Sequence, residues 1–297
     1  MNNILTKKNM ENIEITATMS PFAVRFEEEA ELVPFPEKLI YLSRFSVSET
    51  EKEVLLAIDS LMVATSVQIM AMLADKPEIT KKKISAALNR LYKGGYVYKL
   101  QFRSNGACSS FKVFVISSAR GSALFRSIFD RYPVKNRYAE SISDPAKLKK
   151  YLAANQLISQ VKGVESSEMA QFYKKKAFLF PEVRISVHGR FTVNGRDYFC
   201  EVARREEDYK EKATARFKTL KKIISSYKNV SPVLTEKPTL IILCEDEEHR
   251  AEMMKIASKY FRSSDDVLFS YDLALTEEFD KAFTTYAIEE GKEKMSA

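Results

Sequence analysis

The chain has 297 residues, 45% of them apolar, with 19 Phe and 14 Tyr, which is ample for packed cores and excludes wholesale disorder. Its net charge of +7 and pI near 9.0 are compatible with an anionic partner but do not identify one. No apolar run nears the ~20 residues of a membrane span and the N-terminus has no secretory pattern, so we expect a cytoplasmic protein with no membrane partner.

The first domain is predicted at residues 48–130, after an arm or lead-in at 1–47 that mixes acidic and proline-containing stretches. Helical spacing of apolar residues predicts helices over 48–62, 65–74 and 79–95. The first begins at a capping serine, Ser48, and the third is stopped by Gly94 and Gly95. Strands over 96–102 and 111–117 and a helix over 118–129 follow. Three helices and then a hairpin is the order of a winged helix-turn-helix domain.

Positive charge is concentrated in this domain. Between Lys76 and Arg120 there are ten basic residues and one acidic residue, Glu78, a local net charge of +9. Three consecutive lysines open the third helix, where the helix dipole disfavours cations by a few tenths of a kcal/mol. An anionic partner would offset that cost, and in helix-turn-helix proteins this end of the helix enters the major groove of DNA.

The candidate DNA-binding residues follow from this placement. We expect lysines to contact phosphates, and residues one and two turns along the helix to read bases, while the hairpin reaches phosphate or the minor groove. The set is Lys81, Lys82, Lys83, Ser85, Asn89, Arg90, Lys93 and Arg103. Two alternatives remain open: the lysines form an ordinary solvated face, or the domain docks a protein.

A connector with two prolines is predicted at 131–148, followed by a second domain at 149–297. Its expected elements are helices over 148–163 and 167–177, strands over 182–188 and 190–203, a long helix over 206–230, a buried strand over 239–244, a helix over 247–261, a strand over 266–273 and a C-terminal helix over 276–294. Helices alternating with strands in this way predict an α/β core, so the fold class is α+β with an α/β second half.

Two carboxylates in the second domain are candidate catalytic residues. In nucleases with the PD-(D/E)xK motif, an acid opens one strand, and a second acid lies two positions before a lysine on the next. The acids hold Mg²⁺ and the lysine positions the attacking water. Here Glu182 and Glu201 are the candidate acids, but Ala203 stands at the lysine position. A lysine from the following helix, Lys210 or Lys212, is one possible replacement.

The simpler hypothesis is that Glu201 is a salt-bridge partner of Arg204, Arg205 or Lys210, and that Glu182 is an ordinary acid at a strand start. With no lysine at the expected position, we favour this hypothesis and expect no enzyme activity, no cofactor and no metal. Three scattered cysteines do not indicate a disulfide framework or a zinc site, and we expect His188 and His249 to be ordinary surface residues.

The two halves together resemble the replication-relaxation family of plasmids and integrative elements. The resemblance spans roughly residues 50–245 and is carried by FPEVRISV, by GRDYFCEVARREEDYKEKATARFKTLKKI and by Asn155 in LAANQL. It implies an N-terminal winged helix and a degenerate restriction-endonuclease-like second domain. Where the family has proline-aspartate this chain has Pro181-Glu182, and the acid that follows Glu-Val in the family is absent after Val202.

These features predict a non-catalytic protein that binds double-stranded DNA in replication, conjugative transfer or transcriptional control of a mobile element. Expected partners beyond DNA are a relaxase, replication proteins or a second copy of the chain, since winged-helix proteins often read DNA as two-fold dimers. The alternative is a Mg²⁺-dependent nuclease that uses Glu182 and Glu201.

Overall fold

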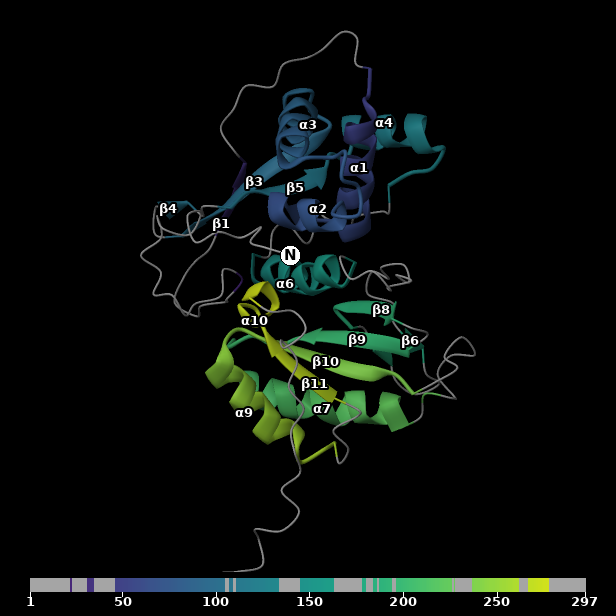
Figure 1. Cartoon of the computed structure of the whole chain (residues 1–297). Coiled ribbons are helices and arrows are strands. Elements are labelled where there is room, and N and C mark those ends of the chain that lie inside the picture. Colours follow the sequence, from purple (N-terminus) through teal and green to yellow (C-terminus); the bar gives the residue numbers. More distant parts are fainter. Residues whose placement is uncertain are drawn as a thin grey trace, which may run out of the picture. The chain divides into compact units, whose positions relative to one another are not determined.

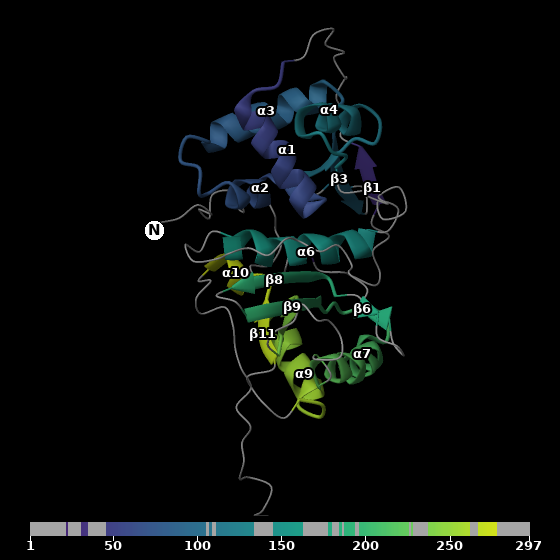
Figure 2. The same cartoon turned by 90° about the vertical axis from the view of Figure 1, so that its right-hand side faces the viewer.

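The computed structural model describes most of the chain. The described residues are 22, 31–34, 46–104, 107–108, 111–133, 145–162, 178–179, 184–185, 187–193, 196–225, 227, 237–261 and 267–277. They form a mixed α+β protein (Figures 1 and 2). None of the helices in these ranges combines the length and the apolar character that a membrane crossing requires. The candidate acid Glu182 lies outside the described residues.

The chain divides into two compact units, one of residues 25–167 and one of residues 168–297 together with 1–24. This division differs from the predicted boundary at 148. The helix predicted to open the second domain is α6 (Pro145–Lys162), and it belongs to the first unit. Sequence periodicity predicted the helix but gave no information about the unit against which it packs.

The elements of the first unit follow one another as helix, short strand, two helices, hairpin and two helices, with one strand in front. They are β1 (Glu31–Pro34), α1 (Glu49–Leu61), β2 (Ala64–Thr65), α2 (Ser66–Met72), α3 (Lys81–Lys93), β3 (Val97–Ser104), β4 (Ala107–Cys108), β5 (Val113–Ile116), α4 (Arg120–Phe129) and α6.

Helix α1 begins where the sequence predicted. The Ser48 side chain accepts a hydrogen bond from the Glu51 amide, and the Glu51 carboxylate accepts one from the Ser48 amide at 2.8 Å, forming a capping box. One face of the helix is fully buried, with Val54, Leu55 and Ile58 each 0% exposed. Helix α1 therefore forms the centre of this unit's core.

Helix α3 ends in a Schellman motif. Gly95 has φ +75°, the Tyr96 amide donates to the Leu91 carbonyl at 2.9 Å, and the Gly95 amide donates to the Tyr92 carbonyl at 2.9 Å. A side chain at this φ would be strained, which explains why glycine follows the helix here. The motif turns the chain directly into β3, so the orientation of α3 is fixed relative to the β3–β5 hairpin.

The sheet of the first unit has the order β1-β3-β5-β2, with β4 paired to β3, and every pairing is antiparallel. Strand β2 pairs with β5, and β1 pairs with the other side of β3 with Glu31 opposite Arg103. Residues 31–34, which we expected in an irregular lead-in, therefore extend the sheet as a further strand.

Helix α6 is joined to this unit through Asn155. Its side-chain nitrogen donates to the carbonyls of Leu61 at 2.9 Å and Val63 at 2.6 Å. These two carbonyls flank Met62, which has φ +66°, a backbone conformation that costs a non-glycine residue energy. Asn155 thus holds the strained turn between α1 and β2 in place.

The second unit contains a four-stranded sheet of order β11-β10-β9-β8, in which β9, β10 and β11 are parallel and β8 is antiparallel. Its described elements are β6 (Phe178–Leu179), β7 (Arg184–Ile185), β8 (Gly189–Val193), β9 (Arg196–Val202), α7 (Tyr209–Ser225), β10 (Thr239–Cys244), α9 (Glu247–Ala257), β11 (Val267–Tyr271) and α10 (Ala274–Glu277).

Helices α7 and α9 lie on the same face of this sheet (Figure 1). Alternate residues of the strands, such as Phe199, Ile242 and Phe269, form one buried cluster with Phe217 of α7 and Met253 of α9. Side chains alternate between the two faces along a strand, so Glu201 on β9 points to the same face as Phe199. The carboxylate is thereby brought beneath α7.

Candidate functional site

The exposed face of α3 carries the residues predicted to contact DNA. Lys82, Ser85, Asn89 and Lys93 are all exposed and follow one another at the three- and four-residue spacing that aligns side chains on one side of a helix. The opposite side is buried through Ile84, Leu88 and Leu91. The helix therefore presents a continuous polar and basic stripe along its whole length.

The first turn of α3 contains three lysines and no acidic residue. Thr80 caps the helix, accepting a hydrogen bond from the Lys83 amide at 3.4 Å. The Lys83 ammonium donates to the Glu78 carbonyl at 2.8 Å, so this lysine is folded back onto its own loop. Lys81 and Lys82 are exposed, so they are the two lysines best placed to contact a phosphate.

Arg90, which we predicted as a base-reading residue, makes its contacts with other parts of the protein. Its guanidinium donates to both carboxylate oxygens of Glu51 at 3.0 and 3.1 Å and to the Ser46 carbonyl at 2.9 Å. Glu51 is 1% exposed, so this contact fixes α3 against the start of α1. The donor fork of Arg90 that would bind a guanine edge is occupied, and we assign it a structural role.

Several other basic residues of the charged stretch also have contacts within the protein. Lys76 forms a salt bridge with Glu53 at 2.6 Å, Lys112 donates to Gln101 at 2.7 Å, and the Arg120 guanidinium donates to the Gly94 carbonyl at 3.1 Å. Arg103 on β3 is exposed. The local charge is therefore divided between structural contacts and the outer surface of α3.

The second candidate site surrounds Glu201, which is 8% exposed. The guanidinium of Arg216 on α7 donates to both of its oxygens, from Nε to Oε1 at 2.7 Å and from Nη2 to Oε2 at 2.8 Å. On the other side, Nδ1 of His188 lies 3.3 Å from Oε2. Glu201 is therefore held by a bidentate arginine and flanked by a histidine.

Burial alone would raise the pKa of Glu201, but the positive charge of His188 and the hydrogen bonds and charge of Arg216 lower it to about 2. Nδ1 of His188 also accepts the Val202 amide at 3.2 Å. That nitrogen cannot accept this hydrogen bond and carry a proton for Glu201 at the same time. When the imidazole is neutral, Arg216 is the cation that balances the carboxylate.

The partners of Glu201 differ from those predicted. Arg204 is buried and donates to both oxygens of Asp272 at 2.9 and 3.0 Å, and Lys210 forms a salt bridge with Glu252 at 2.9 Å. Sequence proximity favoured these cations, but the strand direction and the helix turn carry them away from the carboxylate. Ala203, at the expected lysine position, packs against the apolar cluster of the second unit.

A Mg²⁺ ion would need the oxygens of Glu201 as ligands, and both accept hydrogen bonds from Arg216, whose positive charge would repel a cation at this carboxylate. The described residues around Glu201 therefore do not fit a metal ion. Arg216 lies one position before Phe217, beside the apolar stripe of α7. That border position in an amphipathic helix is the sequence signal that could have identified it as an inward-facing cation.

The prediction that both histidines are surface residues is wrong for His249, which is 0% exposed. Its Nδ1 accepts the Glu245 amide at 3.3 Å, and its ring makes an edge contact with Tyr209. Burial, with the charges of Arg205 and Arg204, lowers the pKa of His249 to about 4. The imidazole is therefore neutral at physiological pH and forms part of the packing between α9 and the sheet.

No family model, no curated protein and no solved structure matches the chain.

Proposed function

We propose that the protein binds double-stranded DNA without cleaving it, and that the first unit does so as a winged helix-turn-helix domain. The observation that carries the proposal is the exposed stripe of Lys82, Ser85, Asn89 and Lys93 on α3, headed by lysines at the helix N-terminus. Lysine suits phosphate, and the amide of asparagine suits an adenine edge in the major groove.

The topology supports this assignment of α3. In a winged helix, a short strand follows the first helix and joins the edge of the later hairpin, and the third helix precedes that hairpin. Here β2 follows α1 and pairs with β5, and α3 leads through Gly95 into β3. In that arrangement the third helix is the one that enters the major groove, and the β3–β5 connection is the wing.

The charge at the start of α3 supports an anionic partner. Lys81 and Lys82 are exposed at the end of the helix where partial positive charge already accumulates, and no acidic residue in the first turn compensates them. Each exposed cation there costs a few tenths of a kcal/mol at low ionic strength. A DNA phosphate at this helix end would reverse the sign of that interaction.

The absence of cleavage is supported by the contacts of Glu201. Both oxygens of its carboxylate accept hydrogen bonds from Arg216, and the position where a nuclease would carry its lysine is Ala203, packed on the apolar cluster. We propose that the second unit keeps a nuclease-like scaffold with a different role. The resemblance to the replication-relaxation family would place the DNA binding in plasmid or integrative-element replication, transfer or transcriptional control, with a relaxase or a second copy of the chain as partner.

The test is the salt dependence of binding to duplex DNA, measured by fluorescence anisotropy. Each phosphate contact contributes about 0.9 to the slope of log affinity against log salt, so K81A/K82A should reduce the slope by roughly 2 and weaken binding to all sequences. K83A should have a smaller effect, because the Lys83 ammonium already donates a hydrogen bond to the Glu78 carbonyl. The charge-matched control is K255A/K259A, which removes two exposed lysines of the second unit. Wild-type binding by K81A/K82A would overturn the proposal.

Cleavage is tested separately, by incubating supercoiled and linear DNA with Mg²⁺ and with Mn²⁺. We expect no nicking above the level of a buffer control. Nicking that is abolished by E201A would establish the nuclease alternative and overturn the non-catalytic part of the proposal while leaving the DNA-binding part intact.

A further inference from the structure

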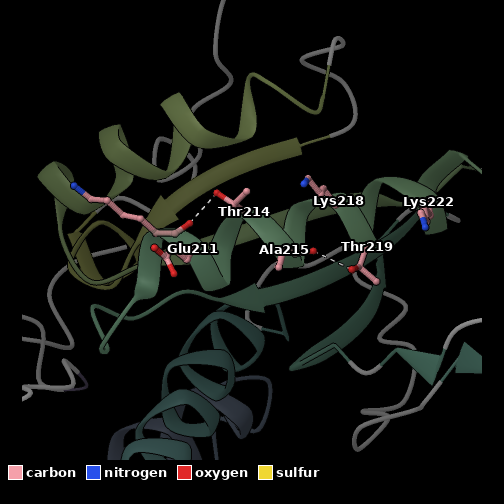
Figure 3. Close-up of a pocket in the computed structure, with 7 residues that line it drawn as sticks. Glu211, Thr214, Ala215, Lys218, Thr219 and Lys222 are labelled. Atoms are coloured by element: carbon pink, nitrogen blue, oxygen red, sulfur yellow. Dashed lines mark hydrogen bonds between the residues drawn. The ribbon is translucent and has the colours of Figure 1, made fainter.

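A groove runs along the outer face of α7, on the side away from the sheet (Figure 3). Thr214, Ala215 and Thr219 line it, together with Lys218 and Lys222 in its C-terminal half. The groove is shallow and open to solvent, and all the residues that line it belong to α7. Its lining of lysines and threonines lacks the aromatic and branched apolar side chains that hold a drug-like ligand.

Lysines supply the hydrogen-bond donors of the groove that can reach a ligand. The Thr214 hydroxyl donates to the Lys210 carbonyl at 2.8 Å and the Thr219 hydroxyl donates to the Ala215 carbonyl at 2.9 Å, as Figure 3 shows. These hydroxyl protons are therefore used within the helix. The ammonium groups of Lys218 and Lys222 remain as donors, and an ammonium recognises charge rather than a particular base or shape.

The positive charge lies at one end of the groove. Lys210, at the N-terminal end, is paired with Glu252 at 2.9 Å, and the neighbouring Glu211 is acidic. Lys218 and Lys222 are four residues apart, so like charges face each other on the helix surface, which costs a few tenths of a kcal/mol. The helix dipole favours Lys222 in the last turn, but Lys218 lies too far from the helix end to benefit.

We propose that this groove binds the phosphate backbone of double-stranded DNA as a second, sequence-independent contact surface of the protein. Charge complementarity identifies the occupant, because Lys218 and Lys222 are exposed on an open face of α7 that an extended anionic polymer can reach. This inference rests on the proposed DNA binding but assigns it a site that is independent of α3.

The experiment compares two charge-matched variants of the full chain. One removes the groove lysines, as K218Q/K222Q, and the other removes two exposed lysines of the same helix that do not line the groove, as K212Q/K221Q. Each lost phosphate contact reduces the salt slope by roughly 1, so K218Q/K222Q should reduce it by about 2. The control should change it by less than half as much. Equal losses in both variants would show a general effect of net charge and overturn the proposal.

A photo-crosslinking amino acid supplies a readout that does not depend on affinity. Placed at Thr219 in the groove, it should crosslink to duplex DNA, and at Lys212 it should not. Loss of binding to anionic lipid vesicles by K218Q/K222Q, with DNA binding and crosslinking unchanged, would assign the groove to a membrane surface and overturn the proposal.

The variants also separate this inference from the proposed function. If K81A/K82A binds DNA like the wild type while K218Q/K222Q loses affinity and slope, the α3 assignment fails and the groove assignment stands. If K81A/K82A loses affinity while K218Q/K222Q and the Thr219 crosslink show no effect, the groove assignment fails and the α3 assignment stands.

Discussion

Arg216 and Glu201 form a bidentate pair between α7 and β9, with donor–acceptor distances of 2.7 and 2.8 Å. The pair turns a carboxylate that would be costly to bury into a hydrogen-bonded anchor for the helix. It also places a positively charged guanidinium against both oxygens of the carboxylate. A single arginine thus joins α7 to β9 and neutralises the charge of Glu201.

The first prediction concerns acid stability. The folded-state pKa of Glu201 is about 2, below its ordinary value of 4.5, so folding favours the ionised form. The resulting stabilisation is fully present above pH 4.5 and is lost as the pH falls from 4.5 to 2, by up to about 3 kcal/mol. In R216A the charge of His188 still lowers the carboxyl pKa, but the hydrogen bonds and charge of Arg216 are gone, so burial raises that pKa towards its ordinary value.

Urea unfolding between pH 2 and pH 5 checks this. We expect the free energy of unfolding of R216A to be lower at pH 5 and to fall less steeply towards pH 2. K212A, which removes an exposed cation of the same helix, is the matched control and should retain the wild-type slope. A wild-type slope in R216A would contradict the assignment of Arg216 as the counter-ion.

The second prediction concerns His249 and a different pH range. Its folded-state pKa of about 4 is below its ordinary value of 6.5, so the folded protein binds fewer protons than the unfolded chain between these values. Stability is complete above pH 6.5 and decreases as the pH falls to 4, by about 3 kcal/mol. H249N keeps an acceptor for the Glu245 amide but does not titrate.

We therefore expect H249N to be less stable than the wild type at pH 7, because the contact with Tyr209 is lost, and to show a flatter stability profile between pH 4 and 6.5. Denaturant melts at half-unit intervals of pH measure this. H188N, which replaces the partly exposed histidine, tests specificity. If H249N keeps the wild-type profile in this range, His249 is not the titrating group.

The sequence predicted those helix and strand boundaries that are determined by neighbouring residues. The helix starts at Ser48 and Thr80, the stop at Gly95 and the fully buried strand β10 depend on neighbouring residues, and each lies where it was expected. Contacts between distant segments were missed. Residues 31–34 pair with β3 about seventy positions later, and nothing in a four-residue stretch indicates that partner.

The candidate sites divide in the same way. The exposure of Lys82 and Asn89 followed from the periodicity of α3, because a helix with one apolar stripe must expose the other side. The partner of Arg90 did not follow, since it depends on where α1 crosses α3. Arg216 and the burial of His249 likewise depend on packing between elements that are separated along the chain.

The third prediction separates structure from recognition on α3. R90A leaves the buried Glu51 carboxylate without its guanidinium partner, so we expect a loss of stability of about 1–3 kcal/mol, moderated by the 43% exposure of the Arg90 side chain. N89A is exposed and should leave the melting temperature unchanged while altering the preferred DNA sequence. Thermal melts and selection from a randomised duplex library measure the two effects. If R90A keeps the wild-type stability but changes the preferred DNA sequence, Arg90 reads bases and its structural assignment is wrong.

The fourth prediction concerns the turn between α1 and β2. N155A removes both hydrogen bonds that hold the carbonyls of Leu61 and Val63, so we expect a loss of about 2 kcal/mol from two buried acceptors left without that donor. M62G relieves the positive φ of +66°, and the carbonyls around a glycine can reorient at lower cost. The penalty of N155A should therefore be smaller in the M62G background than in the wild type. A double-mutant cycle from urea unfolding at pH 7 measures the coupling, and strictly additive effects would show that Asn155 does not stabilise the strained turn.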